Sequence, residues 1–518
     1  MSKRGGSLLL KSKRFSKLSL VTFVIIFGLI GAIILIKSLA APNPALPGDL
    51  NNDNTVNVTD LSILLSNYGT TNSAADINND GLVNVLDLSI LLSHYGQTVS
   101  GGGGGTITGT TYYVSANGSD SNNGTSQSTA WRTLTRANQA NLQPGDGVLF
   151  AAGQTFNGTL SPNYSGTSAL PVTVGAYGSG NAIITGGVYI TSGHHDLIFD
   201  HLDLSLAGDT IFASQGSGST GVNNITLQNS YIHDSQFTGL HNMSVDNNWT
   251  IKNNTFKNIG DSGMIITGTG TVIDSNTISN TGTNTSLTYG KHGIYAKAAN
   301  MTISNNDISN DTNGSLISIR YHGAKVYGNN LHDNPFPLSF FPQDPSNSGT
   351  DYIYNNRMWN ISDWIFYYAN LNDSGIDGNP NAVPTGMDVV LASNTAVLLP
   401  GAANDAQVVN LGELTVAHVW VMNNIFTGSY TYTYAGCTHC IESNNDWHGG
   451  AVGVPNGTGD LRVNPNLTPG PTLTLPSGSP LIDKGTANVP GLTYSLNPDG
   501  APLHYKGAAP DMGAVELQ

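Results

Sequence analysis

The stretch Trp249-Thr-Ile-Lys-Asn-Asn254-Thr-Phe256 contains the unit that decides the fold of this 518-residue chain. An alternating apolar segment leads to an Asn, one variable residue and a large apolar residue. Most successive copies lie roughly 20 to 30 residues apart, a period typical of a solenoid. The other copies are Asn229-Ser-Tyr231, Asn276-Thr-Ile278, Asn306-Asp-Ile308, Asn329-Asn-Leu331, Asn356-Arg-Met358, Asn424-Ile-Phe426 and Asn445-Asp-Trp447.

The apolar segments inside each repeat alternate as β-strands do, for example in Met301-Thr-Ile303, and no helical pattern separates them. Short strands with Asn, Gly and Ser turns predict a mainly β, single-stranded parallel β-helix with one coil per repeat. We expect the Asn side chains to stack from coil to coil, each amide bonding the next. These Asn residues are therefore interpreted as structural.

The region from residue 111 to 518 resembles the right-handed parallel β-helix of the pectin-lyase type. The resemblance implies the handedness of the coil and a carbohydrate-active protein, because that family includes lyases, glycosidases, epimerases and coils without catalysis. A short helix within 133–140 is expected to cap the open N-terminal edge. The segments that carry the resemblance are Tyr112-Tyr-Val-Ser-Ala-Asn-Gly-Ser-Asp120, Ala130-Trp-Arg-Thr-Leu134, Leu142-Gln-Pro-Gly-Asp-Gly-Val-Leu-Phe150 and Pro510-Asp-Met-Gly-Ala-Val-Glu516.

The N-terminus carries an export signal. Residues 1–17 are basic, and residues 18–37 hold an uncharged apolar run closed by Lys37, about as long as a bilayer core is thick. We interpret the run as a transmembrane anchor with the N-terminus in the cytoplasm, and a cleaved signal peptide as the alternative. Either way the body is extracellular. Outside residues 1–37 the chain is strongly acidic, which excludes nucleic acid as a partner.

Residues 42–98 contain a duplicated unit, in which a loop and an apolar segment from Asp49 to Gly69 recur from Asp76 to Gly96. Oxygen side chains stand at the loop positions by which a twelve-residue EF-hand-type loop wraps Ca²⁺, and position 7 offers its carbonyl. The sequence therefore predicts Ca²⁺ as the cofactor of a small helical unit. The predicted metal ligands are Asp49, Asn51, Asp53, Thr55, Asn57 and Asp60 in the first loop and Asp76, Asn78, Asp80, Leu82, Asn84 and Asp87 in the second.

This pair of loops resembles a type I dockerin, in which Asp closes each loop. The resemblance implies a cohesin-like partner, read by loop positions 10 and 11. Those positions hold Val58-Thr59 and Val85-Leu86, whereas a Ser/Thr pair is more usual in the family. A glycine-rich linker, 99–110, follows and is expected to be flexible.

Three further features bear on the site. Cys437 and Cys440 lack the companions of a metal site, so we expect a local disulfide or two turn thiols. The long interval from Asn356 to Asn424 holds either an inserted loop or two to three coils without the Asn phrase. The aromatic run 364–368 is either a buried strand or a surface for stacking sugar rings.

Cations and histidines gather on neighbouring coils between residues 252 and 325. The densest part is Gly290-Lys-His-Gly-Ile-Tyr-Ala-Lys297, followed one coil later by Ile319-Arg-Tyr-His-Gly-Ala-Lys325. Adjacent strands lie about 4.8 Å apart, so residues in matching places form one patch. The candidate catalytic residues are Lys297, Tyr295, Arg320, His292 and His322.

Such a patch suits β-elimination from a uronic acid polymer. A cation neutralises the carboxylate, a base removes the acidic proton beside it, and the glycosidic oxygen leaves from the next carbon. The coil Arg320-Tyr-His-Gly resembles the arginine coil of β-helix alginate- and chondroitin-type lyases, which implies a Lys on the preceding coil, here Lys297 or Lys291. We therefore predict an extracellular polysaccharide as substrate, with Lys297 or Tyr295 as base and Arg320 as the neutralising cation.

Two alternatives stay open. A glycoside hydrolase needs two carboxylates, for which the candidates are Asp234, Asp261, Asp274 and Asp307. The phrase Asp200-His201 has a faint similarity to a pectate lyase motif, but the Arg motif of that lyase is missing. The other alternative is a non-catalytic surface protein that binds glycans through aromatic and Asn side chains.

Overall fold

The computed structural model describes two compact units, residues 1–100 and residues 101–518. In the first unit the described residues are 48–93 without 49, 51–55, 57, 73–74 and 79–80. In the second they are 107–515 without 217, 342–348, 369–387, 400–406, 411–417, 434–439, 453–455, 469–471, 497–502 and 506. Within these residues no helix is long and apolar enough to span a membrane, and the predicted span, 18–37, lies outside them.

The first unit is built on two helices of equal length, α2 (Val58–Ser66) and α3 (Val85–Ser93). Each helix follows one of the two repeated loops. The backbone amide of Gly69 donates to Val83 and that of Val83 donates to Thr70, so the end of one half is joined to the start of the other. A small apolar core closes the unit, made by Leu50, Val56, Ile63, Leu64, Ala75, Val83 and Leu91.

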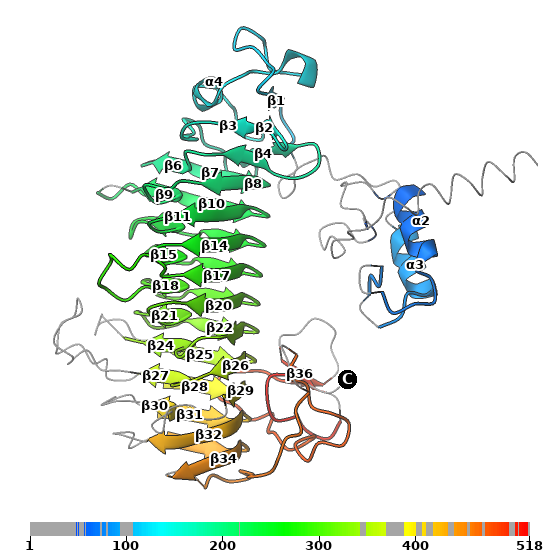
Figure 1. Ribbon diagram of the computed structural model, residues 1–518, viewed down its shortest axis with the longest axis vertical. Coiled ribbons are helices and arrows are strands. Elements are labelled where there is room, and N and C mark those ends of the chain that lie inside the picture. Colours follow the sequence, from blue (N-terminus) through cyan, green and yellow to red (C-terminus); the bar gives the residue numbers. More distant parts are fainter. Residues whose placement is uncertain are drawn as a thin grey trace, which may run out of the picture. The chain divides into compact units, whose positions relative to one another are not determined.

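The second unit is a parallel β-helix (Figure 1), as the repeat predicted, and its coils expose three faces. Face A is a 13-stranded parallel sheet. Its strands are β1 (Thr111–Val114), β2 (Gly147–Ala151), β4 (Val172–Tyr177), β7 (His195–Asp200), β10 (Asn223–Gln228), β13 (Thr250–Lys252), β16 (Val272–Asp274), β19 (Thr302–Ser304), β22 (Lys325–Tyr327), β25 (Asp351–Tyr354), β28 (Asp388–Ala392), β31 (His418–Met422) and β33 (Cys440–Ser443).

Faces B and C are two parallel ladders that join at β32. Face B contains β3 (Thr155–Phe156), β5 (Ala182–Ile184), β8 (Leu202–Ser205), β11 (Tyr231–Ser235), β14 (Thr255–Ile259), β17 (Thr277–Thr281), β20 (Asp307–Asp311), β23 (Asn330–His332), β26 (Arg357–Ile361), β29 (Thr395–Leu398), β32 (Ile425–Thr433) and β34 (Asp446–Val452). Face C contains β6 (Val188–Thr191), β9 (Phe212–Gln215), β12 (Leu240–Asn242), β15 (Met264–Ile266), β18 (Ile294–Ala296), β21 (Ile317–Ile319), β24 (Leu338–Phe340), β27 (Phe366–Tyr368) and β30 (Gln407–Asn410).

The N-terminal end of the coil is capped, and the C-terminal segment packs against the side of the coil. At the N-terminal end, the expected helix is α4 (Leu134–Asn138), whose first turn is capped by the Thr133 hydroxyl, and a 3-10 turn, η1 (Gln127–Thr129), precedes it. At the other end of the chain, residues around Val489 and Leu503 pack on the outer surface of face A. A two-stranded sheet, β35 (Ser495–Leu496) and β36 (His504–Tyr505), lies in this segment.

The predicted Asn ladder is present between faces A and B. In each rung the side-chain oxygen of one Asn accepts the backbone amide and the side-chain amide of the Asn on the preceding coil, as Asn276 does for Asn254. All of these Asn side chains are buried. The rungs are Asn254, Asn276, Asn306, Asn329, Asn356, Asn394, Asn424 and Asn445, and the series ends at Asp460.

Two expectations about the ladder need correction. Asn394 is a rung inside the long interval between Asn356 and Asn424, because Asn356 donates to it and it donates to Asn424. The interval is therefore two coil steps, of 38 and 30 residues, which agrees with the lower of the two coil numbers expected, and the rung that divides them was not recognised in the sequence. Its phrase ends in Ala396 instead of a large apolar residue, which hid it.

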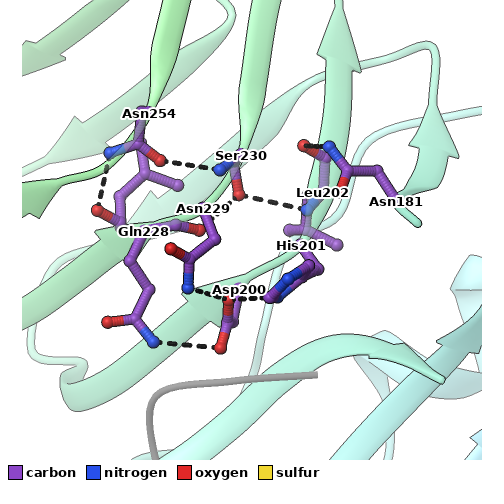
Figure 2. A network of polar contacts seen from close by, with 9 residues as sticks. Asn181, Asp200, His201, Leu202, Gln228, Asn229, Ser230 and Asn254 are labelled. Carbon is purple, nitrogen blue, oxygen red and sulfur yellow. Dashed lines mark hydrogen bonds and ion pairs between the residues drawn. The ribbon is translucent and has the colours of Figure 1, made fainter. Parts of the chain in front are cut away.

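The other correction concerns Asn229, which is one residue out of register. Strand pairing aligns Ser230 with the Asn254 position, and Asn229 adopts a left-handed backbone with φ of 50°. Ser230 donates its backbone amide to Asn254 and its hydroxyl accepts the amide of Leu202 (Figure 2). A hydroxyl thus takes the place of the amide where the ladder begins.

The Asp200-His201 phrase is part of this structural network (Figure 2). The Asp200 carboxylate is fully buried and accepts hydrogen bonds from Gln228 and Asn229 on the next coil, and it also bonds His201 Nδ1. All of these contacts join the carboxylate to side chains of its own and the next coil. The Asp200-His201 phrase therefore serves to hold the coils together, and this structural role accounts for its similarity to a pectate lyase motif.

Candidate functional site

Face C brings together four of the five predicted catalytic residues. Tyr295 points outward from β18, between the buried residues 294 and 296. The Arg320 guanidinium carbon lies 4.9 Å, and the Lys297 ammonium nitrogen 5.0 Å, from the centroid of the Tyr295 ring. The ring of His292 lies 4.8 Å from it, centroid to centroid. Two cations and an imidazole therefore surround one phenol.

The two cations occupy the same place on adjacent coils. The backbone amide of Lys297 donates to the carbonyl of Ile266, and the backbone amide of Arg320 donates to the carbonyl of Ala296. Each cation directly follows the last residue of its strand, so both stand at the same corner of the β-helix. Arg320 is nearly buried, with 3% of its surface exposed, and it lies between the rings of Tyr295 and Phe341. Lys297 is more exposed. The more accessible cation is thus Lys297, backed by Arg320.

His292 lies at the site but as a neutral group. Burial lowers the pKa of its imidazole to about 3, and the positive charge of Arg320 acts in the same direction. Its Nδ1 accepts the backbone amide of Ser315. The neighbouring Lys291 is buried and donates to the carbonyls of Gly282 and Asn284, which removes it from contact with a polymer in solution.

His322 is the predicted catalytic residue that lies elsewhere. It stands in the turn that leads to face A, with 2% of its surface exposed, and its Nδ1 bonds the buried carboxylate of Asp351 at 2.8 Å. The other oxygen of Asp351 accepts the backbone amide of Ala324. His322 therefore fastens two coils to each other and takes no part in the cluster around Tyr295.

His241, one of the histidines on the coils of the predicted patch, belongs to the site although it was not among the predicted catalytic residues. Register places His241 opposite Ile265 and Ile265 opposite Tyr295, so the imidazole lies two coils from the phenol on the same outward row of face C. Burial lowers the pKa of His241, and the charge of Lys297 also lowers it while Asp261 opposes the change. A neutral imidazole facing the cluster is able to accept a proton.

Asp261 and Tyr289 form one side of the site. The Tyr289 hydroxyl donates to Asp261 Oδ2 at 2.9 Å, and the Thr238 hydroxyl donates to the same oxygen at 3.2 Å. Desolvation, together with the hydrogen bond to Asp261, raises the pKa of Tyr289 to about 12. Tyr289 therefore stays protonated at neutral pH and keeps its hydrogen bond to Asp261.

An aromatic strip continues from Arg320 toward the C-terminal coils. Phe341, in contact with Arg320, lies 5.3 Å from Tyr367; Tyr367 stacks at 4.3 Å on Trp364; and Trp364 lies 5.6 Å from Phe336. Phe366 of the same run is buried in the core. The run 364–368 thus contributes buried residues, Ile365 and Phe366, to the core, while Trp364 and Tyr367 are only partly buried, and sugar stacking stays a prediction.

The carboxylates proposed for hydrolysis are dispersed over the coil. Asp261 stands at face C, Asp234 and Asp307 on face B, and Asp274 at the corner between faces A and B. Strands β11 and β20, which carry Asp234 and Asp307, are three coils apart, which is about 14 Å at ~4.8 Å per coil. Asp234 and Asp307 are therefore too far apart to flank one glycosidic bond.

The helical unit has carboxylates suited to Ca²⁺. Asp60, Asp76 and Asp87 are buried, and no Lys or Arg occurs between residues 37 and 132 to neutralise them. The carboxylates that close the two loops make equivalent hydrogen bonds. Asp60 accepts the backbone amide of Leu50, and Asp87 accepts that of Ile77, the equivalent residue of the second loop. Gly81, with φ of 88°, makes the turn at position 6 of the second loop and donates to Asp76.

The described residues hold no group of three or more His, Cys, Asp or Glu side chains arranged around a metal position. Several of the predicted Ca²⁺ ligands lie outside those residues, namely Asp49, Asn51, Asp53, Thr55, Asn57 and Asp80. On the other unit, Cys440 is disulfide-bonded at the start of β33, in line with the expected disulfide, while Cys437 lies outside the described residues.

Two family models match parts of the chain. Residues 179–336 match the model of a right handed beta helix region, and residues 47–94 match that of the dockerin type I domain. A lacto-N-biosidase of Bifidobacterium longum subsp. longum is 44% identical over 78 residues, which cover 14% of this chain. The chain spans only 5% of that curated relative, so the match concerns a small segment of it.

Solved structures similar to this chain include two carbohydrate-active β-helices. Pectate lyase Pel9A is 18% identical, with 79% of this chain and 97% of that chain covered and a TM-score of 0.47. The GH136 lacto-N-biosidase from Eubacterium ramulus is 14% identical, with 65% and 67% covered and a TM-score of 0.45. At these identities the likeness concerns the fold alone. The chain therefore contains a segment that matches the dockerin type I domain and a segment that matches a right handed beta helix region, and the second match agrees with the parallel coil of the structure.

Proposed function

We propose that the β-helix is a polysaccharide lyase that cleaves an extracellular uronate-containing glycan by β-elimination at face C. The observation that carries this proposal is the pair of cations, Lys297 and Arg320, placed on both sides of one outward-facing phenol, Tyr295. A protein with 34 acidic and 19 basic residues would otherwise repel an anionic polymer. A local cationic cluster is what such a substrate needs in order to bind.

The roles follow from exposure. Lys297, the more exposed cation, meets the uronate carboxylate, and buried Arg320 adds positive potential from behind the ring. Tyr295, reacting as its phenolate, accepts the proton from the carbon beside the carboxylate, and the neutral imidazole of His241 is the second group able to do so. The electron pair of that C–H bond forms a carbon–carbon double bond as the glycosidic C–O bond breaks, and the departing oxygen takes up a proton from the newly formed Tyr295 hydroxyl or from water.

The burial of Arg320 changes the role first expected for it. A guanidinium covered by two aromatic rings exposes little of itself to a carboxylate, whereas its field still reaches the surface through a thin, weakly polarisable layer. Lys297 therefore takes the direct contact. Hydrolysis is the less favoured reaction because the cations gather around Tyr295, whereas Asp234 and Asp307 lie three coils apart on face B.

The test is the ultraviolet absorbance of the unsaturated uronate product. Purified residues 106–518 are mixed with alginate, pectate, hyaluronan and unsulfated chondroitin, and product is followed with and without Ca²⁺. We expect absorbance to rise on at least one polymer and to vanish in Tyr295→Phe. New reducing ends without absorbance would instead indicate hydrolysis, and binding without either signal would indicate a glycan-binding protein.

We propose for the dockerin domain that it binds two Ca²⁺ ions and attaches the chain to a cohesin-like partner. Its partner-reading residues Val85 and Leu86, at the start of α3, are 61% and 55% exposed. Exposed apolar side chains at these positions favour a docking surface that is less polar than a Ser/Thr pair would give. Replacing Leu86 by Asp should abolish capture by a cohesin panel while leaving Ca²⁺ binding unchanged.

The extracellular location and the N-terminal anchor remain part of the proposal. Both rest on the basic segment 1–17 and the apolar run 18–37. Fractionation of cells that express the full chain, compared with a chain that begins at residue 42, tests the anchor. Membrane association of the full chain supports the anchor, whereas release of the full chain into the medium, with the shortened chain retained in the cell, favours the cleaved signal peptide.

A further inference from the structure

Face C is divided along the helix axis into zones of different chemistry. In the centre lies the cationic cluster around Tyr295. Toward the C-terminus the aromatic strip of Phe341, Tyr367, Trp364 and Phe336 continues directly from Arg320. Successive contacts of 4.3 to 5.6 Å join the two zones without interruption.

The N-terminal side of the cluster is apolar as well. Tyr189 and Met243 are each 37% exposed and Phe237 is 41% exposed. Tyr189 stands on the outward row that leads through residues 213, 241 and 265 to Tyr295, four coils away, or ~19 Å at ~4.8 Å per coil. Exposed aromatic and thioether side chains thus lie upstream of the cations, and aromatic rings lie downstream.

Cations are confined to the centre of this face. Between residues 326 and 461 the whole sequence contains one Lys or Arg, Arg357, and it belongs to β26 on face B. On the upstream side, Lys252 and Lys257 stand on faces A and B. No segment inserted between β27 and β32, whatever its course, can bring a basic residue to the aromatic strip, because none is present in that part of the sequence.

This distribution decides which acidic polymer fits. A polyuronate carries a carboxylate on every sugar, so its residues outside the centre would face aromatic rings and the carboxylate of Asp261 without a cation. A sugar without charge presents C–H groups that pack well on aromatic rings. A polymer that alternates charged and neutral sugars therefore matches the surface better than one in which all sugars are charged.

We infer that face C binds a heteroglycan in which uronate residues alternate with neutral sugars, lying along the helix axis with one carboxylate at Lys297. This inference rests on the proposed function and adds the class of substrate. Neutral sugars on one side stack on the strip that contains Trp364, and those on the other side reach toward Tyr189. Charge pairing at the centre sets the register, and ring stacking supplies the affinity of the flanks.

The experiment compares polymers that differ in charge spacing. The full chain is assayed for kcat/KM on hyaluronan and unsulfated chondroitin, which alternate, and on alginate and pectate, in which the backbone is uronate throughout or nearly so. We expect the alternating polymers to be preferred at least ~10-fold. Equal or faster cleavage of the polyuronates would overturn the inference while leaving the proposed lyase intact.

If no polymer is cleaved, the result counts against the proposed lyase activity, and the proposed substrate class is then tested by binding. Calorimetry with the same four polymers then measures affinity directly. Tighter binding of the alternating polymers supports the inference independently of catalysis. Equal affinity for all four, or binding of none, contradicts it.

A variant far from the cluster tests the axial path. Tyr189→Ala should raise KM on long alternating chains several-fold and leave KM on a tetrasaccharide unchanged, because a short chain centred at Lys297 does not reach four coils upstream. The matched control is Leu170→Ala, which removes a side chain of similar exposure away from face C. Equal KM changes for long and short substrates would indicate a structural effect and count against the path.

Discussion

Arg320 and Tyr295 lie on adjacent coils of face C, with the guanidinium carbon 4.9 Å from the centroid of the phenol ring. Phe341, one coil further on, covers the other side at 4.5 Å. A guanidinium between two rings is held by cation–π attraction and by packing, and its planar shape suits that position. The strongest fixed charge of the candidate site is therefore set into the surface instead of projecting from it.

Replacing Arg320 by Ala should lower kcat on the best polymer by about 100-fold, because the transition-state charge loses one preorganised cation. Arg320→Lys should recover part of the rate, since a charge is kept but the stacking is weakened. Steady-state kinetics on folded protein, verified by circular dichroism, measures both. Lys325→Ala, an exposed cation on face A, is the control and should keep full rate. Undiminished cleavage by Arg320→Ala would remove Arg320 from the mechanism.

Replacing Asn394 by Ala should destabilise the β-helix by roughly 2–3 kcal/mol or more. Its side-chain amide donates to Ile353 and Asn424, and its oxygen accepts two hydrogen bonds from Asn356, so the change leaves buried groups unpaired. Urea unfolding followed by tryptophan fluorescence measures the loss. Asn488→Ala, an exposed Asn, should change stability by less than about 0.5 kcal/mol. Similar values for the two variants would contradict a continuous ladder.

Stability should fall as pH rises from about 4 to 8 through the contribution of Asp446. Burial raises the pKa of this carboxyl from 3.8 to about 7. The folded form thus holds a proton that the unfolded chain has already released, so the stabilisation is complete below pH 3.8 and is lost as pH passes 7. Asp446→Asn, which keeps an acceptor for Val463, should be more stable than the parent at pH 8 by about 1–3 kcal/mol and nearly equal at pH 4.

Urea unfolding at pH 4, 6 and 8 checks this difference. The exposed Asp209→Asn provides the comparison, and its effect should not vary with pH in this window. A parent and an Asp446→Asn variant that respond to pH alike would show that the carboxyl titrates normally.

Removing Ca²⁺ should unfold the dockerin domain and leave the β-helix intact. Asp60, Asp76 and Asp87 are buried carboxylates that would lose a neutralising ion, and metal binding of this kind is coupled to folding. Calorimetry of the full chain should give two Ca²⁺ per molecule, against none for residues 106–518. Asp87→Ala should remove one of the two. Full binding by residues 106–518 would place the ions elsewhere.

Repeat architecture was readable from the sequence because it is local. In a solenoid each coil contacts only its neighbours, so a period of Asn254, Asn276 and Asn306 is enough to predict parallel pairing and a stacked amide ladder. The same logic failed at Asn229 and Asn394. A side-chain hydroxyl fills the Asn position at Ser230, and a small residue follows Asn394, so the phrase changed while the backbone position stayed the same.

The candidate site was predictable only as a neighbourhood. Sequence spacing placed Tyr295, Lys297 and Arg320 on adjacent coils, and the structure brings both cations to 5.0 Å or less from one ring. Spacing could not separate His292, at the ring, from His322, which turns away to Asp351. It also passed over His241, because two coils of unequal length intervene before Tyr295.

By itself the sequence determined the coil, the duplicated loops and the near absence of Lys and Arg between residues 326 and 461, since these depend on period and composition. Tertiary structure alone decided which cations are accessible. Lys291 and Arg320 are buried and Lys297 is not, because burial depends on which rings and carbonyls the adjacent coils present at each corner. Many of those contacts join residues a full coil apart in the sequence, and they are fixed only when the coils stack in register.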